Sequence, residues 1–221
     1  MKNKMKRVAC VGEAMIELSM MDGNAQMNVA GDTLNTAIYL QWTAPQVTVD
    51  YITCLGNDTF SDSIFAFIAD HGVGNSKIKR IVDGTPGLYA ITTSPEGERS
   101  FTYWRSNSAA RCLFSNGDFT MLETYDAVYL SGISLAILPH IVRLSLLEWL
   151  NKHLICLIFD SNYRPHLWES LESAQQMTSA FWARADILLP SIDDEMKLFD
   201  ETEDQVAFRF SCMAKSGALK R

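Results

Sequence analysis

The sequence predicts an α/β protein built around a largely parallel sheet, with a second, smaller sheet apart from it. Short apolar runs bounded by polar residues recur along the 221 residues and indicate strands buried on both faces. Helical patterns separate most of these runs, and such alternation is typical of parallel sheets with helical crossovers. Two β-rich runs joined by turn residues interrupt the alternation and predict a hairpin. The sequence therefore indicates Rossmann-like layers with a small additional sheet.

The first part of the chain predicts two strands and a helix. Residues 7–11 form an apolar run that Gly12 and Glu13 break, and residues 15–20 resemble a strand with one solvated face. Gly31 precedes a helical pattern over 33–42, for which Asp32 is the expected N-cap. A glycine before a helix N-terminus favours either simple capping or anion binding, and both interpretations stay open.

Residues 47–53 predict a strand, and a helix capped near Asp58 and closed by Gly72 follows. The hairpin consists of residues 88–93 and 99–104. Since a two-stranded hairpin is marginal alone, we expect it to pair with strands near 15–20 and 27–29. At its end, Tyr103, Trp104 and Arg105 favour either a polar ligand site or ordinary cross-strand packing with a solvated arginine.

The second half of the chain continues the alternation. Strands are expected at 126–130, 154–159 and 186–190, with a loop at 131–135. Helices are expected at 139–152, with an apolar stripe of Ile141, Leu144, Leu147 and Leu150, at 174–185 and after Ser191. The last helix has a possible capping box of Ser191 and Asp194, with Glu195 in its first turn.

The apolar run at 154–159 leads into a polar loop that is the strongest candidate for a ligand site. Asp160, Asn162 and Arg164 emerge at the carboxyl end of the predicted strand, which is where open α/β sheets bind ligands. Arg164 offers a planar set of donors suited to carboxylate or phosphate, and Pro165 ends the strand. An ordinary strand-to-helix loop is an equally good interpretation of the pattern by itself.

Composition excludes several classes of protein. The net charge of −7 argues against a nucleic-acid binder, and no run approaches the ~20 apolar residues of a membrane helix. The five cysteines have no metal-binding spacing and several lie in apolar runs, so we expect reduced thiols in a cytoplasmic protein.

Two strings resemble the ribokinase-type (PfkB) carbohydrate kinases, in particular their 2-keto-3-deoxygluconate kinase branch: Asp160-x-Asn162-Tyr163-Arg164-Pro165-x-Leu167-Trp168 and Ala30-Gly31-Asp32-x-x-Asn35. The resemblance implies a three-layer ribokinase-like core in one incomplete domain, 1–221, with a β-sheet lid formed by about 14–30 and 86–106. It also implies ATP-dependent phosphorylation of a sugar acid with Mg²⁺, and a possible homo-oligomer through the open edges of the lid sheet.

The resemblance also implies the site residues. Expected substrate contacts are Gly31, Asn35, Tyr89, Tyr103, Trp104, Arg105 and Arg164, and expected nucleotide contacts are Asn162, Tyr163, Arg164 and Glu195. No metal ligand is assigned.

The family's carboxyl-terminal Asp-Thr-x-x-Ala/Gly-Gly-Asp motif, whose last Asp is the general base, is absent from this sequence. We therefore assign no catalytic residue and expect this chain to be inactive alone, truncated at its C-terminus and prone to association. Gly217 is expected to close a helix over 204–216, with a strand beginning at Ala218. The alternatives are a non-catalytic fragment that at most binds a sugar acid, and a nucleotide-binding regulator. The second is disfavoured because no Gly-rich phosphate loop is present.

Overall fold

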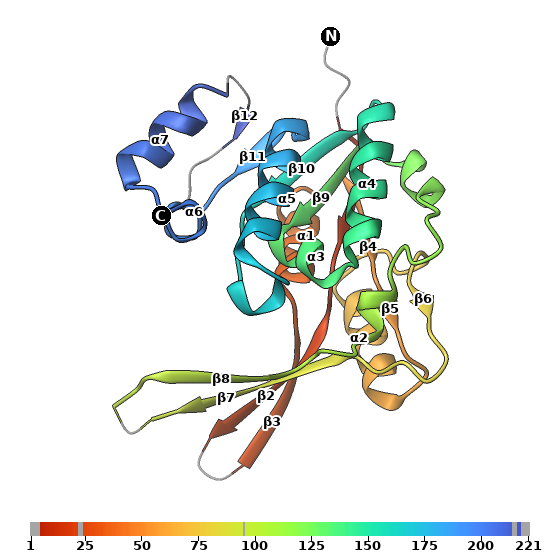
Figure 1. The fold of residues 1–221 in the computed structure, drawn as a ribbon. Helices are drawn as coiled ribbons and strands as arrows, with labels where there is room; N and C mark the ends of the chain where they lie inside the picture. The colour runs from red at the N-terminus through yellow and green to blue at the C-terminus, as the bar shows by residue number, and fades with distance from the viewer. Residues whose placement is uncertain (1–4, 22–23, 95, 214–215, 218–221) are drawn as a thin grey trace. The chain divides into compact units, whose positions relative to one another are not determined.

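The computed structural model describes residues 5–21, 24–94, 96–213 and 216–217 (Figure 1). The chain divides into two compact units. The N-terminal unit is Cys10–Leu113, and the C-terminal unit combines Met1–Ala9 with Phe114–Arg221. We describe each unit by itself, and the expectation of one incomplete domain stays a prediction.

The C-terminal unit contains the parallel sheet that the sequence predicts. Its strands lie in the order β12 (Ser216–Gly217), β11 (Ile187–Leu189), β10 (Cys156–Asp160), β9 (Ala127–Ser131) and β1 (Arg7–Val11). The β9–β10, β10–β11 and β11–β12 pairs are parallel. All of β9 is buried, as expected for a strand covered on both faces. This arrangement, together with the helices, confirms the α/β class.

Helices connect these strands: α3 (Gly132–Ile137), α4 (His140–Lys152), α5 (Leu171–Arg184), α6 (Ile192–Phe199) and α7 (Glu203–Ser211). The 3₁₀ segments are η2 (Thr120–Thr124) and η3 (Pro165–Leu167). Helices α4 and α5 pack side by side over the sheet (Figure 1), and α6 packs against α7.

The prediction of a loop at 131–135 is wrong, because most of this segment belongs to α3. Ser131 caps α3 through a reciprocal capping box with Ser134, which satisfies backbone donors at the start of the helix. The capping box predicted for Ser191 and Asp194 is absent, since Ser191 makes no side-chain cap hydrogen bond.

The buried face of α4 also differs from the prediction. The helix buries Val142, Arg143, Leu146 and Leu150, whereas Ile141 is 69% exposed and Leu144 is 39% exposed. Arg143 can be buried because it forms an ion pair with Glu169 and stacks over the Trp168 ring, 4.9 Å from its centroid. Arg143 therefore shifts the buried face away from the predicted stripe.

The predicted helix over 204–216 is too long. Helix α7 ends at Ser211, and Gly217 lies in β12 rather than in a C′ position. A Cβ at Gly217 would be 2.1 Å from the backbone oxygen of Leu188, so the glycine allows close strand pairing. The strand expected to begin at Ala218 falls outside the described residues.

The N-terminal unit contains the end of β1, with Cys10 and Val11, beside β4 (Thr48–Ile52). It also contains α1 (Asp32–Thr43), α2 (Thr59–Asp70), η1 (Ala109–Cys112) and the short parallel pair β5 (Cys54–Leu55) and β6 (Lys79–Arg80).

Two of the three helix-end predictions in this unit are confirmed. Asp58 caps α2 by accepting from the backbone of Phe60 and Ser61. Gly72 follows the helix with φ +73°, as expected for a C′ glycine. Asp32 is not the cap of α1, however, because Gly31 occupies that position and Asp32 is already helical.

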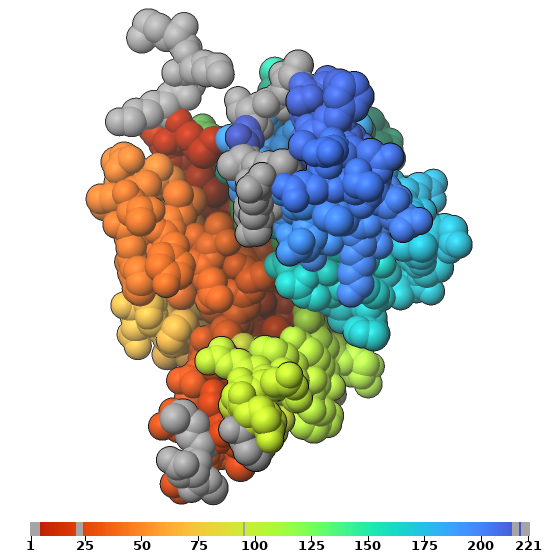
Figure 2. Space-filling view, turned by 90° about the vertical axis from the view of Figure 1, so that its left-hand side faces the viewer, coloured from red at the N-terminus to blue at the C-terminus, as the bar shows by residue number. Residues whose placement is uncertain are grey.

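A four-stranded sheet in the N-terminal unit has the order β3 (Asn24–Ala30), β2 (Met15–Met21), β7 (Gly87–Thr93) and β8 (Arg99–Trp104). The hairpin β7–β8 is antiparallel and joins β2 through a parallel pair, so the predicted pairing is confirmed. Figure 2 shows the hairpin in yellow-green next to the red-orange strands. Its role as a lid stays a prediction.

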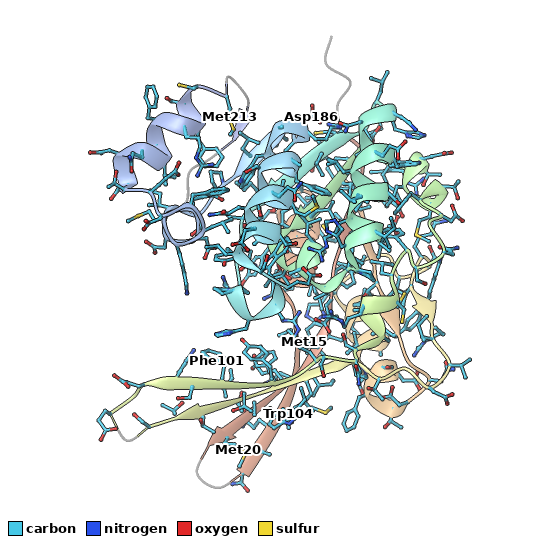
Figure 3. All side chains as sticks on the ribbon, in the orientation of Figure 1. Met15, Met20, Phe101, Trp104, Asp186 and Met213 are labelled. Carbon is cyan, nitrogen blue, oxygen red and sulfur yellow. The ribbon has the colours of Figure 1, made fainter. Side chains whose placement is uncertain are left out.

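Side-chain alternation gives this sheet two different faces. The aromatic face carries Glu17, Tyr89, Phe101 and Tyr103. The apolar face carries Ile16, Leu18, Met20, Met27, Leu88 and Trp104. Figure 3 shows Phe101 and Trp104 projecting from opposite faces.

Among the described residues, none of the helices combines the length and the apolar character needed to cross a membrane. The five cysteines, all in the described part of the chain, are free thiols.

Candidate functional site

The aromatic face brings together Tyr89 and Tyr103, two of the predicted substrate contacts. These residues are directly paired across β7 and β8, and their rings stack with centroids 5.5 Å apart. The Phe101 ring lies 6.4 Å from each of them. The three rings form a continuous apolar platform, and Phe101 and Tyr103 are about half exposed. Such a platform with polar groups beside it suits the faces and hydroxyls of a sugar.

Glu17 adds a carboxylate to this platform. It accepts a hydrogen bond from the Tyr89 hydroxyl, and its Oε1 also lies 3.3 Å from Ser19 Oγ. Burial, followed by the Glu17 interaction, raises the pKa of Tyr89, so the phenol remains a neutral donor near pH 7. Glu17 therefore orients Tyr89 and gives the face a hydroxyl acceptor. No local pattern identifies Glu17 as a site residue, because its partner Tyr89 lies 72 residues away in the sequence.

Arg105 follows the end of β8 and forms a buried ion pair with Glu13. The side chains are 8% and 1% exposed, respectively. Burial raises the pKa of Glu13, while the positive charge of Arg105 acts in the opposite direction. The buried Nε of Arg105 has no hydrogen-bond partner among the described residues. Arg105 is thus held through Nη2, while its Nε–H makes no hydrogen bond among the described residues.

Two glycines provide the space for this ion pair. A Cβ at Gly87 would lie 2.6 Å from Glu13 Oε1 and 3.1 Å from Arg105 Cβ. A Cβ at Gly31 would lie 2.4 Å from the backbone oxygen of Glu13. Both distances are too short for a side chain, so Gly31 acts here by close packing against the backbone at Glu13.

The structure does not bring Trp104 and Asn35 to this group. Trp104 is 58% exposed and lies on the apolar face, opposite Tyr103. Asn35 lies exposed in the first turn of α1, where its backbone N–H donates to the Gly31 oxygen at 2.8 Å. Their predicted substrate contacts stay predictions.

The C-terminal unit holds the second group, in the loop that leaves β10. Asn162 has φ +30°, a conformation that few residues adopt and that asparagine tolerates better than most. Such strained positions concentrate at functional sites. Tyr163 is buried, and burial raises its pKa. Arg164 is 51% exposed in its side chain. Asn162 and Arg164 are thus both more accessible than Tyr163 between them.

The base of this loop is fixed by contacts with neighbouring strands. Tyr129 Oη donates to Asp160 Oδ2 at 3.0 Å, and Ser191 N donates to Ser161 Oγ at 2.6 Å. A Cβ at Gly132 would lie 2.0 Å from the backbone oxygen of Ser161. The start of α3 therefore packs directly against the loop backbone.

Glu195 is fully buried and serves as a connection between helices. Its Oε2 accepts from Arg209 Nη2 at 2.8 Å and its Oε1 from Trp182 Nε1 at 3.2 Å. Burial raises the pKa of Glu195, and the contacts with Arg209 and Trp182 oppose that shift. Arg209 also pairs with Glu201 and lies over the Phe199 ring. This environment favours a structural role, and the predicted nucleotide contact of Glu195 stays untested.

Asp194 is a partly exposed carboxylate in the first turn of α6, and the sequence did not lead us to assign it a ligand. Its side chain is 19% exposed, and its Oδ1 lies 3.3 Å from Arg164 Nη1. Its position in the first turn of α6, next to the expected contact Glu195, is the signal that could have identified it.

These residues fit a nucleotide with hydrated Mg²⁺ in part. Arg164 supplies a cation for phosphate, and Asp194 supplies one carboxylate. Magnesium commonly takes one or two protein carboxylates together with phosphates and water. Among the described residues, no cluster of three or more His, Cys, Asp or Glu side chains could hold a metal ion by itself.

Comparisons with known proteins identify the family of this chain. The chain matches the pfkB family of carbohydrate kinases over residues 5–214. It is 41% identical to the 2-dehydro-3-deoxygluconokinase of Dickeya dadantii, over 89% of this chain and 66% of that protein. It is 38% identical to the 2-dehydro-3-deoxygluconokinase of Escherichia coli K12, over 98% of this chain and 74% of that protein. The chain thus spans about two thirds to three quarters of the length of these relatives.

Solved structures share the fold. A PfkB protein from Polaromonas sp. JS666 has a TM-score of 0.83 at 22% identity, over 99% of this chain and 76% of that one. The 2-dehydro-3-deoxygluconokinase from Thermotoga maritima has a TM-score of 0.81 at 21% identity, over 97% of this chain and 72% of that one. The predicted ribokinase-like fold is therefore confirmed, and the chain belongs to the pfkB family of carbohydrate kinases.

Proposed function

We propose that the whole protein transfers the γ-phosphoryl group of ATP to the terminal hydroxyl of 2-keto-3-deoxygluconate. Two relatives at 41% and 38% identity carry the equivalent name, 2-dehydro-3-deoxygluconokinase. The observation that carries the substrate class is Arg105, whose buried Nε lacks a partner among the described residues. A buried guanidinium donor suits the carboxylate of a sugar acid.

Each group of residues has a role in this proposal. The aromatic face binds the sugar, with Tyr89 and Tyr103 as the platform and Glu17 as an acceptor for hydroxyls. Arg105 binds the carboxylate, and Gly31 keeps the backbone at Glu13 in place. Substrate contacts by Asn35 and Trp104 remain predictions from the resemblance. Because Trp104 is exposed on the apolar face, its position favours a contact with a second copy of the protein instead.

Asn162 and Arg164 would contact the ATP phosphates, and Arg164 would also approach the substrate. Tyr163 is buried and would act through its backbone. Asp194 would hold hydrated Mg²⁺, while Glu195 would keep α6 in position. The metal ion would neutralise charge on the transferring phosphoryl group.

No described carboxylate is assigned as the general base. The family motif that would supply it is absent from the 221-residue sequence. The alternative is therefore that this chain is a non-catalytic form that at most binds a sugar acid.

A coupled ATP-to-ADP assay tests the proposal. It compares the whole protein with the 221-residue chain, each with 2-keto-3-deoxygluconate, its galactonate epimer and fructose. We expect turnover of the sugar acids by the whole protein, little turnover of fructose, and none by the shorter chain. Equal turnover of fructose would overturn the substrate class, and turnover by the 221-residue chain would show that another carboxylate acts as the base.

We further propose that the protein acts in the cytoplasm as a homo-oligomer, with a second copy covering the apolar face of the four-stranded sheet. Met20, Met27 and Trp104 on that face are 45%, 48% and 58% exposed. Apolar side chains gathered on one sheet face favour association, and β3 and β8 leave open edges beside them. The free thiols support a reducing compartment.

Replacing Trp104 with glutamate should dissociate this oligomer, because a charge would be buried in the contact. Sedimentation velocity should show a smaller species for Trp104→Glu than for the unchanged protein. Phe208→Glu is the control, since Phe208 is 71% exposed on α7 of the C-terminal unit. An unchanged sedimentation coefficient for Trp104→Glu would contradict the proposal.

A further inference from the structure

We propose that Glu13 is a positioning residue, which holds Arg105 in the orientation that binds the carboxylate of the substrate. This inference rests on the proposed function and adds a residue that acts through Arg105 without touching the substrate.

The contacts of the pair support this role. Glu13 Oε2 accepts from Arg105 Nη2, and both side chains are at least nine-tenths buried. An unpaired arginine carries several rotatable bonds and would lose that freedom on binding a ligand. The ion pair already fixes the guanidinium, while the Nε remains without a partner among the described residues. The geometry therefore combines an anchored cation with a buried N–H donor whose hydrogen bond is not supplied by the described residues.

The surrounding backbone holds Glu13 equally firmly. Gly31 and Gly87 approach so closely that a Cβ at either position would lie 2.4 Å or 2.6 Å from a Glu13 oxygen. Glu13 lies two residues before the start of β2, and Met15 of that strand pairs with Gly87. Because β7 and β8 pair along their length, the strand that precedes Arg105 is fixed to the strand that contains Gly87. The position of the Arg105 guanidinium thus depends on the Glu13 carboxylate, which lies beside three paired strands, β2, β7 and β8.

A competing role for Glu13 makes the opposite prediction. If Glu13 were an internal competitor of the substrate carboxylate, its neutralisation would free Arg105 and tighten binding. If Glu13 positions Arg105, the same change weakens binding. The Glu13→Gln substitution keeps the shape of the side chain and separates the two roles by the sign of the effect.

The experiment is a double-mutant cycle measured by isothermal titration calorimetry on the whole protein with 2-keto-3-deoxygluconate. The variants are Glu13→Gln, Arg105→Gln and the double substitution. Glu169→Gln is the matched control, since Glu169 pairs with the buried Arg143 in the C-terminal unit. Thermal unfolding monitors whether each variant is folded.

We expect Glu13→Gln to raise the Kd about 10- to 100-fold, by analogy with the loss seen when a partner that orients a metal-ligating residue is removed. Arg105→Gln should raise it at least as much, and the double variant should match Arg105→Gln, because Glu13 has no other route to the substrate. The control should leave the Kd unchanged. An analogue with the carboxylate reduced to an alcohol should bind the unchanged protein and Glu13→Gln equally.

Other outcomes overturn the inference. Tighter binding by Glu13→Gln would identify a competitor, and multiplicative losses in the double variant would identify independent effects. Normal binding by Glu13→Gln would refute the inference while leaving the proposed function intact, whereas no binding by the unchanged protein would refute both. If Glu13→Gln does not fold, Gly87→Ala replaces it, since the new Cβ displaces the carboxylate without removing a charge.

Discussion

Replacing Gly132 with alanine should destabilise the protein by about 3 kcal/mol or more, at the upper end of the range for overpacking. The new Cβ would lie 2.0 Å from the backbone oxygen of Ser161 and 3.3 Å from that of Asn162. Backbone atoms cannot move aside as a flexible side chain can, so either α3 or the loop after β10 must shift. Urea unfolding at pH 7 measures the loss of stability.

The same substitution should weaken ATP binding, because the displaced loop carries Asn162 and Arg164. Ile133→Ala is the control: it removes atoms from the neighbouring position of α3 without approaching Ser161, so ATP affinity should be retained. If Gly132→Ala bound ATP with the unchanged affinity, the loop would not be a nucleotide contact or would tolerate the shift. Unchanged unfolding in urea would contradict the packing argument itself.

Replacing Glu195 with alanine should cost about 2–4 kcal/mol. The change leaves a cavity, removes the acceptor of Trp182 Nε1, and leaves Arg209 with Glu201 as its described ion-pair partner. Glu195→Gln should cost less, because it keeps an oxygen for Trp182 and fills the same volume. Urea unfolding of both variants, with Glu203→Gln in the exposed first turn of α7 as the control, measures the difference.

The pH dependence of the Glu195→Gln variant follows from the raised pKa of Glu195. A carboxyl whose folded-state pKa lies above its unfolded value of about 4.3 contributes stability below that value. The contribution is lost as the pH rises through the folded-state pKa. The unfolding free energy of the unchanged protein, relative to Glu195→Gln, should therefore fall over the interval that begins at about pH 4.3 and extends to higher pH. A rise over this interval would show that attraction to Arg209 outweighs burial.

The β-structure was predictable because its signals are local. Turn residues between 93 and 99 and the β-rich flanks indicated the hairpin, and β7 and β8 form at that place. Because a two-stranded hairpin is only marginally stable alone, it was expected to pair with further strands, and β2 and β3 are those strands. The fold class followed from the alternation of strands and helices, and the loop after β10 followed from the Asp160–Trp168 string.

Other features depend on distant partners that no local pattern reveals. The predicted buried face of α4 was wrong because the ion pair with Glu169 and the contact with the Trp168 ring allow Arg143 to be buried. Glu13 was interpreted only as part of a strand break, although its partner, Arg105, belonged to the predicted site. At α6, exposure rather than residue type separates Asp194 from Glu195, and exposure depends on α7 and Arg209.

The ion pair between Glu13 and Arg105 also has a consequence for the order of folding. It joins residues 92 positions apart, and closing a flexible loop of that length costs about 4 kcal/mol of chain entropy. Such a contact forms after the intervening strands have shortened the effective loop, and it is therefore poorly developed in the transition state. Loss of the pair should accelerate unfolding much more than it slows folding. The ion pair that positions Arg105 at the end of the sheet thus also lowers the rate at which this end of the sheet unfolds.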